Sequence, residues 1–129
     1  MSEFSNALSV SAHALQAQAT RLRHVSENIS NADTPGYRRK TVAFETMRGP
    51  EETDLLSVGR VQLDKSALDR VFDPAHPMAD DSGHYEGSNV DLMLEIADAR
   101  EAQRSYEANL KMFDQTRQMS AGLMDLLRK

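Results

Sequence analysis

Residues 28–37 read Asn-Ile-Ser-Asn-Ala-Asp-Thr-Pro-Gly-Tyr, and they interrupt a regular pattern of apolar residues. Pro35 disfavours the α conformation at Thr34 and lacks the N–H that a helix or a strand ladder needs. Pro-Gly is the favoured centre of a type II turn, because Gly36 accepts a positive φ. Asn28 and Asn31 stand where the preceding helix would end, and asparagine tolerates left-handed backbone. We therefore predict a helix end followed by a sharp turn, formed by Asn28, Asn31, Thr34, Pro35, Gly36 and Tyr37.

The segment before this motif has the periodicity of an amphipathic helix over residues 4–32. Four apolar residues follow one another at intervals of seven, namely Leu8, Leu15, Leu22 and Ile29. The companion line of the same heptad contains Phe4, Val25 and Ala32, but also Ser11 and Gln18. Such a narrow stripe is typical of a helix that pairs with another helix.

A second and longer helix is predicted from residue 88 to the end of the chain. Ser88-Asn89-Val90-Asp91 is a variant of the capping box, with aspartate in place of glutamate. Positions that step by four and three residues then form a seam over about five heptads. The seam consists of Leu92, Ile96, Ala99, Gln103, Tyr106, Leu110, Phe113, Arg117, Ser120, Met124 and Leu127. A helix of this length would span roughly 60 Å, more than the diameter of a small globule.

The middle of the chain, residues 37–87, shows no helical periodicity. Alternating residues at 41–44, and apolar residues at 58–63 and 68–72, predict three short strands. Residues 48–52 contain Gly-Pro and are predicted to form a loop, and residues 73–84 contain two prolines and are predicted to run extended without a helix. The basic residues 38–40 are interpreted as a solvated or interface face.

Composition excludes several classes of protein. The net charge of −5 argues against a nucleic-acid binder, which normally has a basic face. The absence of cysteine removes disulfides, thiol catalysis and zinc–thiolate sites. No run of 18 apolar residues is present, so no direct membrane insertion is expected. Residues 1–6 lack the basic and apolar regions of a cleaved signal peptide, which predicts a cytoplasmic protein or export by a different route.

We find no catalytic motif, and we expect no cofactor and no metal. His76, Asp80, Asp81 and His84 could be drawn as a metal or acid/base cluster, but histidine and aspartate are also ordinary turn residues and the spacing fits neither zinc nor calcium well. Four carboxylates recur at helical spacing near the start of the second helix, and we interpret them as a solvated face. They are Asp91, Glu95, Asp98 and Glu101.

The predicted fold is therefore mainly α, with two long terminal helices paired as an antiparallel α-helical coiled coil and a short, irregular, β-containing middle. The expected division is 1–36, 37–87 and 88–129. Because the helices differ in length and their stripes are narrow, part of the seam is expected to contact other chains. The expected assembly interface consists of Leu8, Leu15, Leu22, Ile29, Ile96, Tyr106, Leu110, Phe113, Met124 and Leu127.

Three motifs resemble one known family, the axial proteins of the bacterial flagellar rod and hook. The first is residues 28–39, Asn-Ile-Ser-Asn-Ala-Asp-Thr-Pro-Gly-Tyr-Arg-Arg. The second is Asp73-Pro74-Ala75-His76-Pro77 followed by Ala79-Asp80 and Gly83. The third is Asn89-Val90-Asp91-Leu92, then Ala102, then residues 104–109, Arg-Ser-Tyr-Glu-Ala-Asn. The second and third motifs together resemble the proteins of the proximal rod.

The resemblance implies a structural protein without enzymatic activity. Members of the family are exported unprocessed by the flagellar type III apparatus and assemble in the periplasm into the rod of the basal body, a hollow helical tube that transmits torque. The implied partners are copies of the chain itself, other rod proteins and the membrane-ring adaptor at the rod base. The alternative interpretations are a coiled-coil adaptor or export-apparatus component that forms a small oligomer, and, more remotely, a metal-dependent hydrolase using His76, Asp80 and His84.

Overall fold

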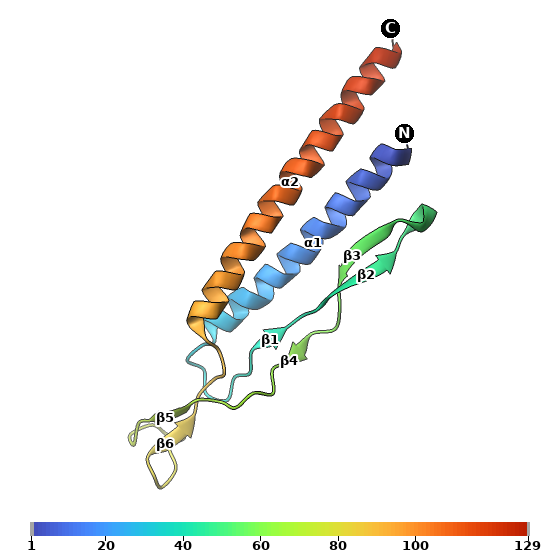
Figure 1. The fold of residues 1–129 in the computed structure, drawn as a ribbon. Coiled ribbons are helices and arrows are strands. Elements are labelled where there is room, and N and C mark those ends of the chain that lie inside the picture. The colour runs from blue at the N-terminus through green and yellow to red at the C-terminus, as the bar shows by residue number, and fades with distance from the viewer. Residues whose placement is uncertain (1, 129) are drawn as a thin grey trace.

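A computed structural model describes residues 2–128. Two helices, α1 (Ser2–Ser30) and α2 (Leu92–Arg128), run antiparallel and place both ends of the chain at the same end of an elongated molecule (Figure 1). All strands lie between them in sequence. The predicted mainly helical fold with a β-containing middle is confirmed.

The turn after α1 brings the chain back beside the helices. Tyr37 N–H donates to the Thr34 carbonyl at 3.1 Å, and Gly36 has a φ of +74°. This combination is that of a type II turn with proline and glycine at its centre. Asn28 and Asn31 do not adopt the left-handed backbone that the sequence suggested. Among the described non-glycine residues, only Glu51 and Glu52 have a positive φ. Asn28 is still helical, and its side chain has a different role.

The start of α2 also differs from the sequence prediction. Asp91, not Ser88, is the N-cap, because its carbonyl accepts the first intrahelical bond from Glu95 N–H at 3.0 Å. Its Oδ1 accepts a bond from Met93 N–H at 3.1 Å, as a capping aspartate does. The Ser88 hydroxyl instead donates to the Ala32 carbonyl and thereby joins the segment before α2 to the end of α1.

The middle forms three separate antiparallel pairs of strands. β1 (Lys40–Thr41) pairs with β4 (Gln62–Leu63), β2 (Phe44–Arg48) with β3 (Asp54–Val58), and β5 (Arg70–Phe72) with β6 (His84–Glu86). The 3-10 turn Pro50–Glu52 joins β2 to β3. The sequence predicted neither β6 nor the extension of β2 to Arg48, and the expected strand at 41–44 is split between β1 and β2.

Helix α1 lies between α2 and the β2–β3 pair (Figure 1). The only buried apolar residues of the described chain are Ala17, Val25, Leu55 and Ala102. Buried polar residues outnumber them, and two of these, Gln18 and His24, each carry a buried side-chain atom without a hydrogen-bond partner in residues 2–128. The core is therefore thin.

The buried faces of the two helices are not the apolar stripes that the heptads predicted. The most buried line of α1 is Ser11, Gln18 and Val25, whereas the four residues of the Leu8 line are half-buried. On α2 the fully buried positions are Glu95 and Ala102, one residue away from the predicted seam. Ile96 and Leu110, which belong to the predicted seam, are 43% and 46% exposed, so α1 leaves much of both side chains uncovered.

We predict that Ala102→Leu lowers the free energy of unfolding by about 1–3 kcal/mol, because Ala102 is fully buried between the helices and a larger side chain overfills the site. Urea denaturation followed by circular dichroism measures the change. The control is Ala108→Leu, an exposed position of the same helix where the change should stay within about 0.5 kcal/mol. Equal effects at both positions would contradict the described helix pairing.

Candidate functional site: a buried polar clasp at the helix junction

The end of α1, the chain after the turn and the start of α2 are joined by buried polar side chains. We call the set Asn28, Tyr37, Arg39, Asn89 and Glu95 the polar clasp. Asn28 and Glu95 are fully buried. The clasp fixes where the two helices meet and where the strands leave them.

Asn28 satisfies all the hydrogen-bonding capacity of its side-chain amide. Its Oδ1 accepts bonds from the Tyr37 hydroxyl and from Lys40 N–H, each at 2.8 Å. Its Nδ2 donates to the Lys40 carbonyl at 3.0 Å and to Glu95 Oε2 at 3.3 Å. One side chain therefore holds the strand after the turn in a fixed register and also reaches α2.

Glu95 carries a buried carboxylate that Arg39 neutralises. Arg39 Nε lies 2.6 Å from Glu95 Oε1, and the exposed fraction of the Glu95 side chain is 1%. Burial alone would lower the pKa of Arg39, but the hydrogen bond and charge of Glu95 outweigh it and raise that pKa above its ordinary value. Because an unpaired buried charge costs several kcal/mol, the Glu95 carboxylate requires Arg39.

Asn89 connects the clasp to the loop after β4. Its Oδ1 accepts a bond from Arg39 N–H at 2.7 Å, and its Nδ2 donates to the Asp64 carbonyl at 2.9 Å. The Asp64 carboxylate lies 3.4 Å from Arg39 Nη1, and hydrogen bonds from Ser66, with help from Arg39, hold its pKa below the ordinary value. The clasp therefore extends from both helices into the middle segment.

The basic residues after the turn are half-buried and bind within the chain, so they do not form a solvated face; the interface remains a prediction. Arg38 Nη1 donates to the carbonyls of Asp64 and Ser66 at 3.1 and 3.0 Å. Lys40 Nζ lies 2.6 Å from Glu27 Oε2; this contact lowers the pKa of Glu27 and raises that of Lys40.

The burial of Glu95 also corrects the sequence prediction that the four carboxylates of α2 form a solvated face. Asp91 and Glu101 are exposed as expected, and Asp98 is half-buried next to Arg21. A sequence signal did exist for Glu95: it lies seven residues before Ala102 and fourteen before Asn109, on a line of small or polar residues. Its partners, however, lie 56 and 67 residues away in sequence.

The His76, Asp80 and His84 side chains lie at the β5–β6 end of the molecule but each has another partner. The His76 ring stacks on Tyr85 with centroids 3.9 Å apart, and Asp80 Oδ1 accepts bonds from Ser82 and His84 N–H. Within residues 2–128, no group of three or more such side chains is arranged to hold a metal ion.

The expected assembly residues fall into two groups. Leu8, Leu15, Leu22, Ile29, Tyr106 and Phe113 are half-buried along the helix pair, and the remaining four are exposed on α2: Ile96, Leu110, Met124 and Leu127. Neither helix, over the described residues, combines the length and apolar composition needed to cross a bilayer.

Families of known proteins match both segments of the chain that meet at this junction. Residues 8–38, which contain Asn28 and Tyr37, match the family described as "Flagella basal body rod protein". Residues 81–126, which contain Asn89 and Glu95, match the family "Flagellar basal body rod FlgEFG protein C-terminal". A protein of Agrobacterium fabrum named flagellar basal-body rod protein FlgC is 44% identical, over 99% of this chain and 98% of its own length.

The chain belongs to the FlgC family of flagellar basal-body rod proteins. Relatives of the same name from Yersinia enterocolitica and Bacillus subtilis are 34% and 32% identical, each over 88% of this chain and 90% and 91% of their own lengths. The chain is thus a structural rod protein of FlgC type.

We predict that Asn28→Ala lowers the free energy of unfolding by about 3 kcal/mol, because it leaves Glu95 Oε2 and the Lys40 backbone without a buried partner, at about 1–3 kcal/mol for each unsatisfied group. Chemical denaturation measures the loss. Asn31→Ala is the matched control: Asn31 is half-buried and its side chain bonds only to the nearby Glu27 carbonyl and Thr34 hydroxyl, which is itself exposed, so its loss should stay below about 1 kcal/mol. A loss at position 28 no larger than at 31 would show that the clasp is not a major constraint.

Proposed function

We propose that this chain polymerises with copies of itself and with other rod proteins into the proximal part of the rod, a hollow shaft that transmits torque and encloses the export channel. Membership of the FlgC family supports the location in the basal body. The observation that carries the proposal is the amount of apolar surface that the helices leave uncovered.

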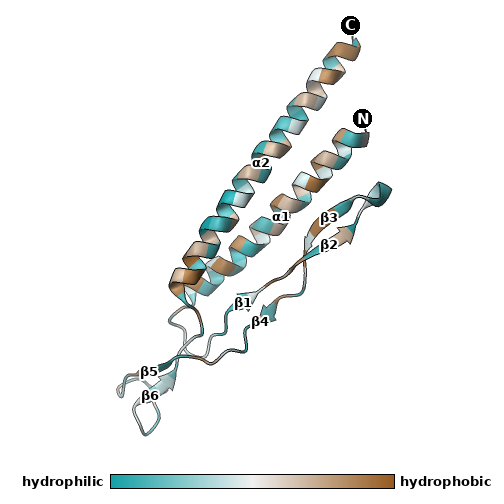
Figure 2. Ribbon diagram, viewed as in Figure 1, coloured by the Kyte–Doolittle hydropathy of each residue, from teal (hydrophilic) through white to brown (hydrophobic). Residues whose placement is uncertain are grey.

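Helix α2 shows this surface most clearly. It extends past the start of α1, and its apolar residues continue to the C-terminal end, where they are drawn brown in Figure 2. Met119, Leu123, Met124, Leu126 and Leu127 are between 39% and 71% exposed. Contiguous apolar residues on a helix face are typical of a surface that another protein covers.

The assembled rod provides the covering helices in this proposal. Apolar residues at heptad spacing pair with neighbouring helices in coiled-coil fashion, and the half-buried Leu8, Leu15, Leu22 and Ile29 leave one flank of α1 for such a contact. Ile96, Leu110, Met124 and Leu127 serve the same role on α2. In the free subunit these surfaces have no partner, which suits a protein that assembles only after export.

The proposed route to the rod is the flagellar type III export apparatus, without cleavage of a signal peptide, into the periplasm. The neighbours we propose there are the sibling rod proteins and the membrane-ring adaptor at the rod base. A subunit with so thin a core has little buried apolar surface to expose when it passes through a narrow channel in an extended form.

The direct test is to delete the gene, restore it with an epitope-tagged copy, and examine purified basal bodies by immunoblotting. We expect the deletion to abolish motility, the tagged copy to restore it, and the chain to co-purify with the rod. A freely soluble small oligomer with normal rods in the deletion strain would instead favour the coiled-coil adaptor.

We predict that Gly36→Val impairs rod assembly more than export, because valine at a φ of +74° is strained by about 1–2 kcal/mol even though no atom lies within 4 Å of the added Cβ. Gly36→Asn is the control, since asparagine tolerates this backbone. Swimming speed and the amount of chain in basal bodies and periplasm measure the effect. Normal motility with valine would show that the turn is not needed for assembly.

A further inference from the structure

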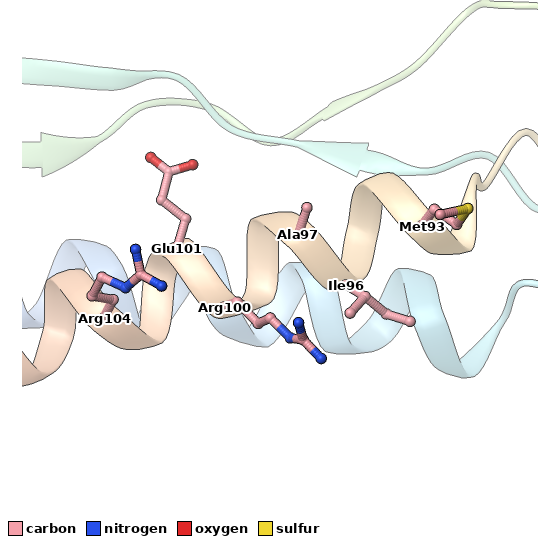
Figure 3. A pocket seen from close by; sticks show the side chains of 6 residues that line it. All are labelled: Met93, Ile96, Ala97, Arg100, Glu101 and Arg104. Atoms are coloured by element: carbon pink, nitrogen blue, oxygen red, sulfur yellow. The ribbon is translucent and has the colours of Figure 1, made fainter.

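One side of α2 carries an open groove that the helix pair does not use. Met93, Ile96, Ala97, Arg100, Glu101 and Arg104 line it, on successive turns, and its volume is about 430 Å³. Ile96 and Arg100 point toward one edge of this face of α2, and Glu101 points toward the other edge, on the side of the strands (Figure 3). Met93 is 81% exposed and Ile96 43%, so the floor of the groove is apolar and accessible.

The charge of this groove is basic. The Glu101 carboxylate lies 3.3 Å from Arg21 of α1, so its negative charge is paired within the molecule. Arg100 and Arg104 form no ion pair within residues 2–128. Two arginines beside an apolar floor suit a partner that brings carboxylates next to an apolar side chain.

The β5–β6 segment has this chemistry. We call residues 69–86 the acidic tip; it projects from the lower end of the molecule in Figure 1. It contains five carboxylates and one arginine, a net charge of −4 with histidines neutral. Phe72 and Met78 are its most exposed large apolar residues, with exposed fractions of 65% and 64%.

The acidic tip is also held in one shape. Gly83 has a φ of +80°, and a Cβ added there would lie 2.9 Å from the Phe72 ring, so the ring rests directly on the glycine. The stacking of His76 on Tyr85 and the bonds from Ser82 and His84 N–H to Asp80 order the rest of the loop. A rigid projection loses little conformational entropy on docking, which favours binding through a small surface.

We propose that the acidic tip of one copy of this chain docks into the groove on α2 of a neighbouring copy. Phe72 and Met78 cover Met93, Ile96 and Ala97, and the exposed carboxylates of the tip face Arg100 and Arg104. The two surfaces differ, so the contact is head-to-tail, and repeated head-to-tail contacts generate rings or open helices. This inference rests on the proposed function, because it names the contact between neighbouring copies in the rod.

The chain contains no cysteine, so a disulfide between two introduced cysteines has no competing thiol in the same chain. Cells carry Met78→Cys and Ala97→Cys together as their only copy of the chain, and their basal bodies are oxidised and separated by non-reducing electrophoresis. We expect a ladder of disulfide-linked multimers. The control combines Met78→Cys with Met119→Cys, an exposed position of α2 outside the groove, and should give no ladder.

Charge reversal tests the same contact without cysteines. We expect Arg100→Glu to reduce the amount of chain in basal bodies, and Asp81→Lys in the same chain to restore it, because the side chains at positions 81 and 100 are then again of opposite charge. A merely structural effect of Arg100→Glu would not be rescued by a change in the tip.

The outcomes separate the two proposals. If the chain is present in basal bodies but the 78–97 pair gives no ladder, or a ladder no stronger than the 78–119 pair, the docking inference is overturned and the proposed function stands. Incorporation of Arg100→Glu at the wild-type level would overturn the inference as well. Absence of the unmodified chain from basal bodies would overturn both.

Discussion

The hydrogen bonds of one buried amide, Asn28, set the geometry on which the rest of the molecule depends. They fix the Tyr37 hydroxyl, both backbone polar groups of Lys40 and the carboxylate of Glu95 at one point. Glu95 in turn requires Arg39, and Arg39 N–H is held by Asn89. These contacts join segments at the end of one helix, after the turn and at the start of the other. The junction of the two helices is therefore held by polar groups, in a protein with very few buried apolar residues.

Apolar burial and the buried hydrogen bonds of the clasp have different roles in this subunit. Apolar burial within one chain is small, and much of the apolar surface of α2 stays exposed. Buried hydrogen-bonded networks contribute directional constraint more than net stability, because desolvation offsets most of their attraction. The clasp therefore specifies the shape of the subunit, while in our proposal the contacts between subunits supply most of the apolar stabilisation. A subunit built in this way is well defined at its junction and weakly held along its helices.

The sequence predicted the elements better than their contacts. The heptads located both helices, and Pro35-Gly36 located the turn, because these signals are local. The heptads did not identify the buried face of α1, since the Leu8 and Ser11 lines share the same period and α1 is covered on two sides, by α2 and by β3. The partners of Glu95 and the pairing of β6 with β5 depend on residues far apart in sequence, which no local pattern specifies. The only local signal for the burial of Glu95 was its place on the line of small or polar residues 95, 102 and 109.

The strand pairs of the middle segment are nested. β1 pairs with β4, and the whole β2–β3 excursion lies between these two strands in the chain. The chain therefore leaves the junction at Thr41 and returns to it at Gln62, next to the point of departure. The segment between those positions starts and ends at one closed pair of strands. It can therefore change in length at its far turn without moving the two helices, as long as β3 keeps Leu55 buried against α1, so one helical framework can present outer surfaces of different size.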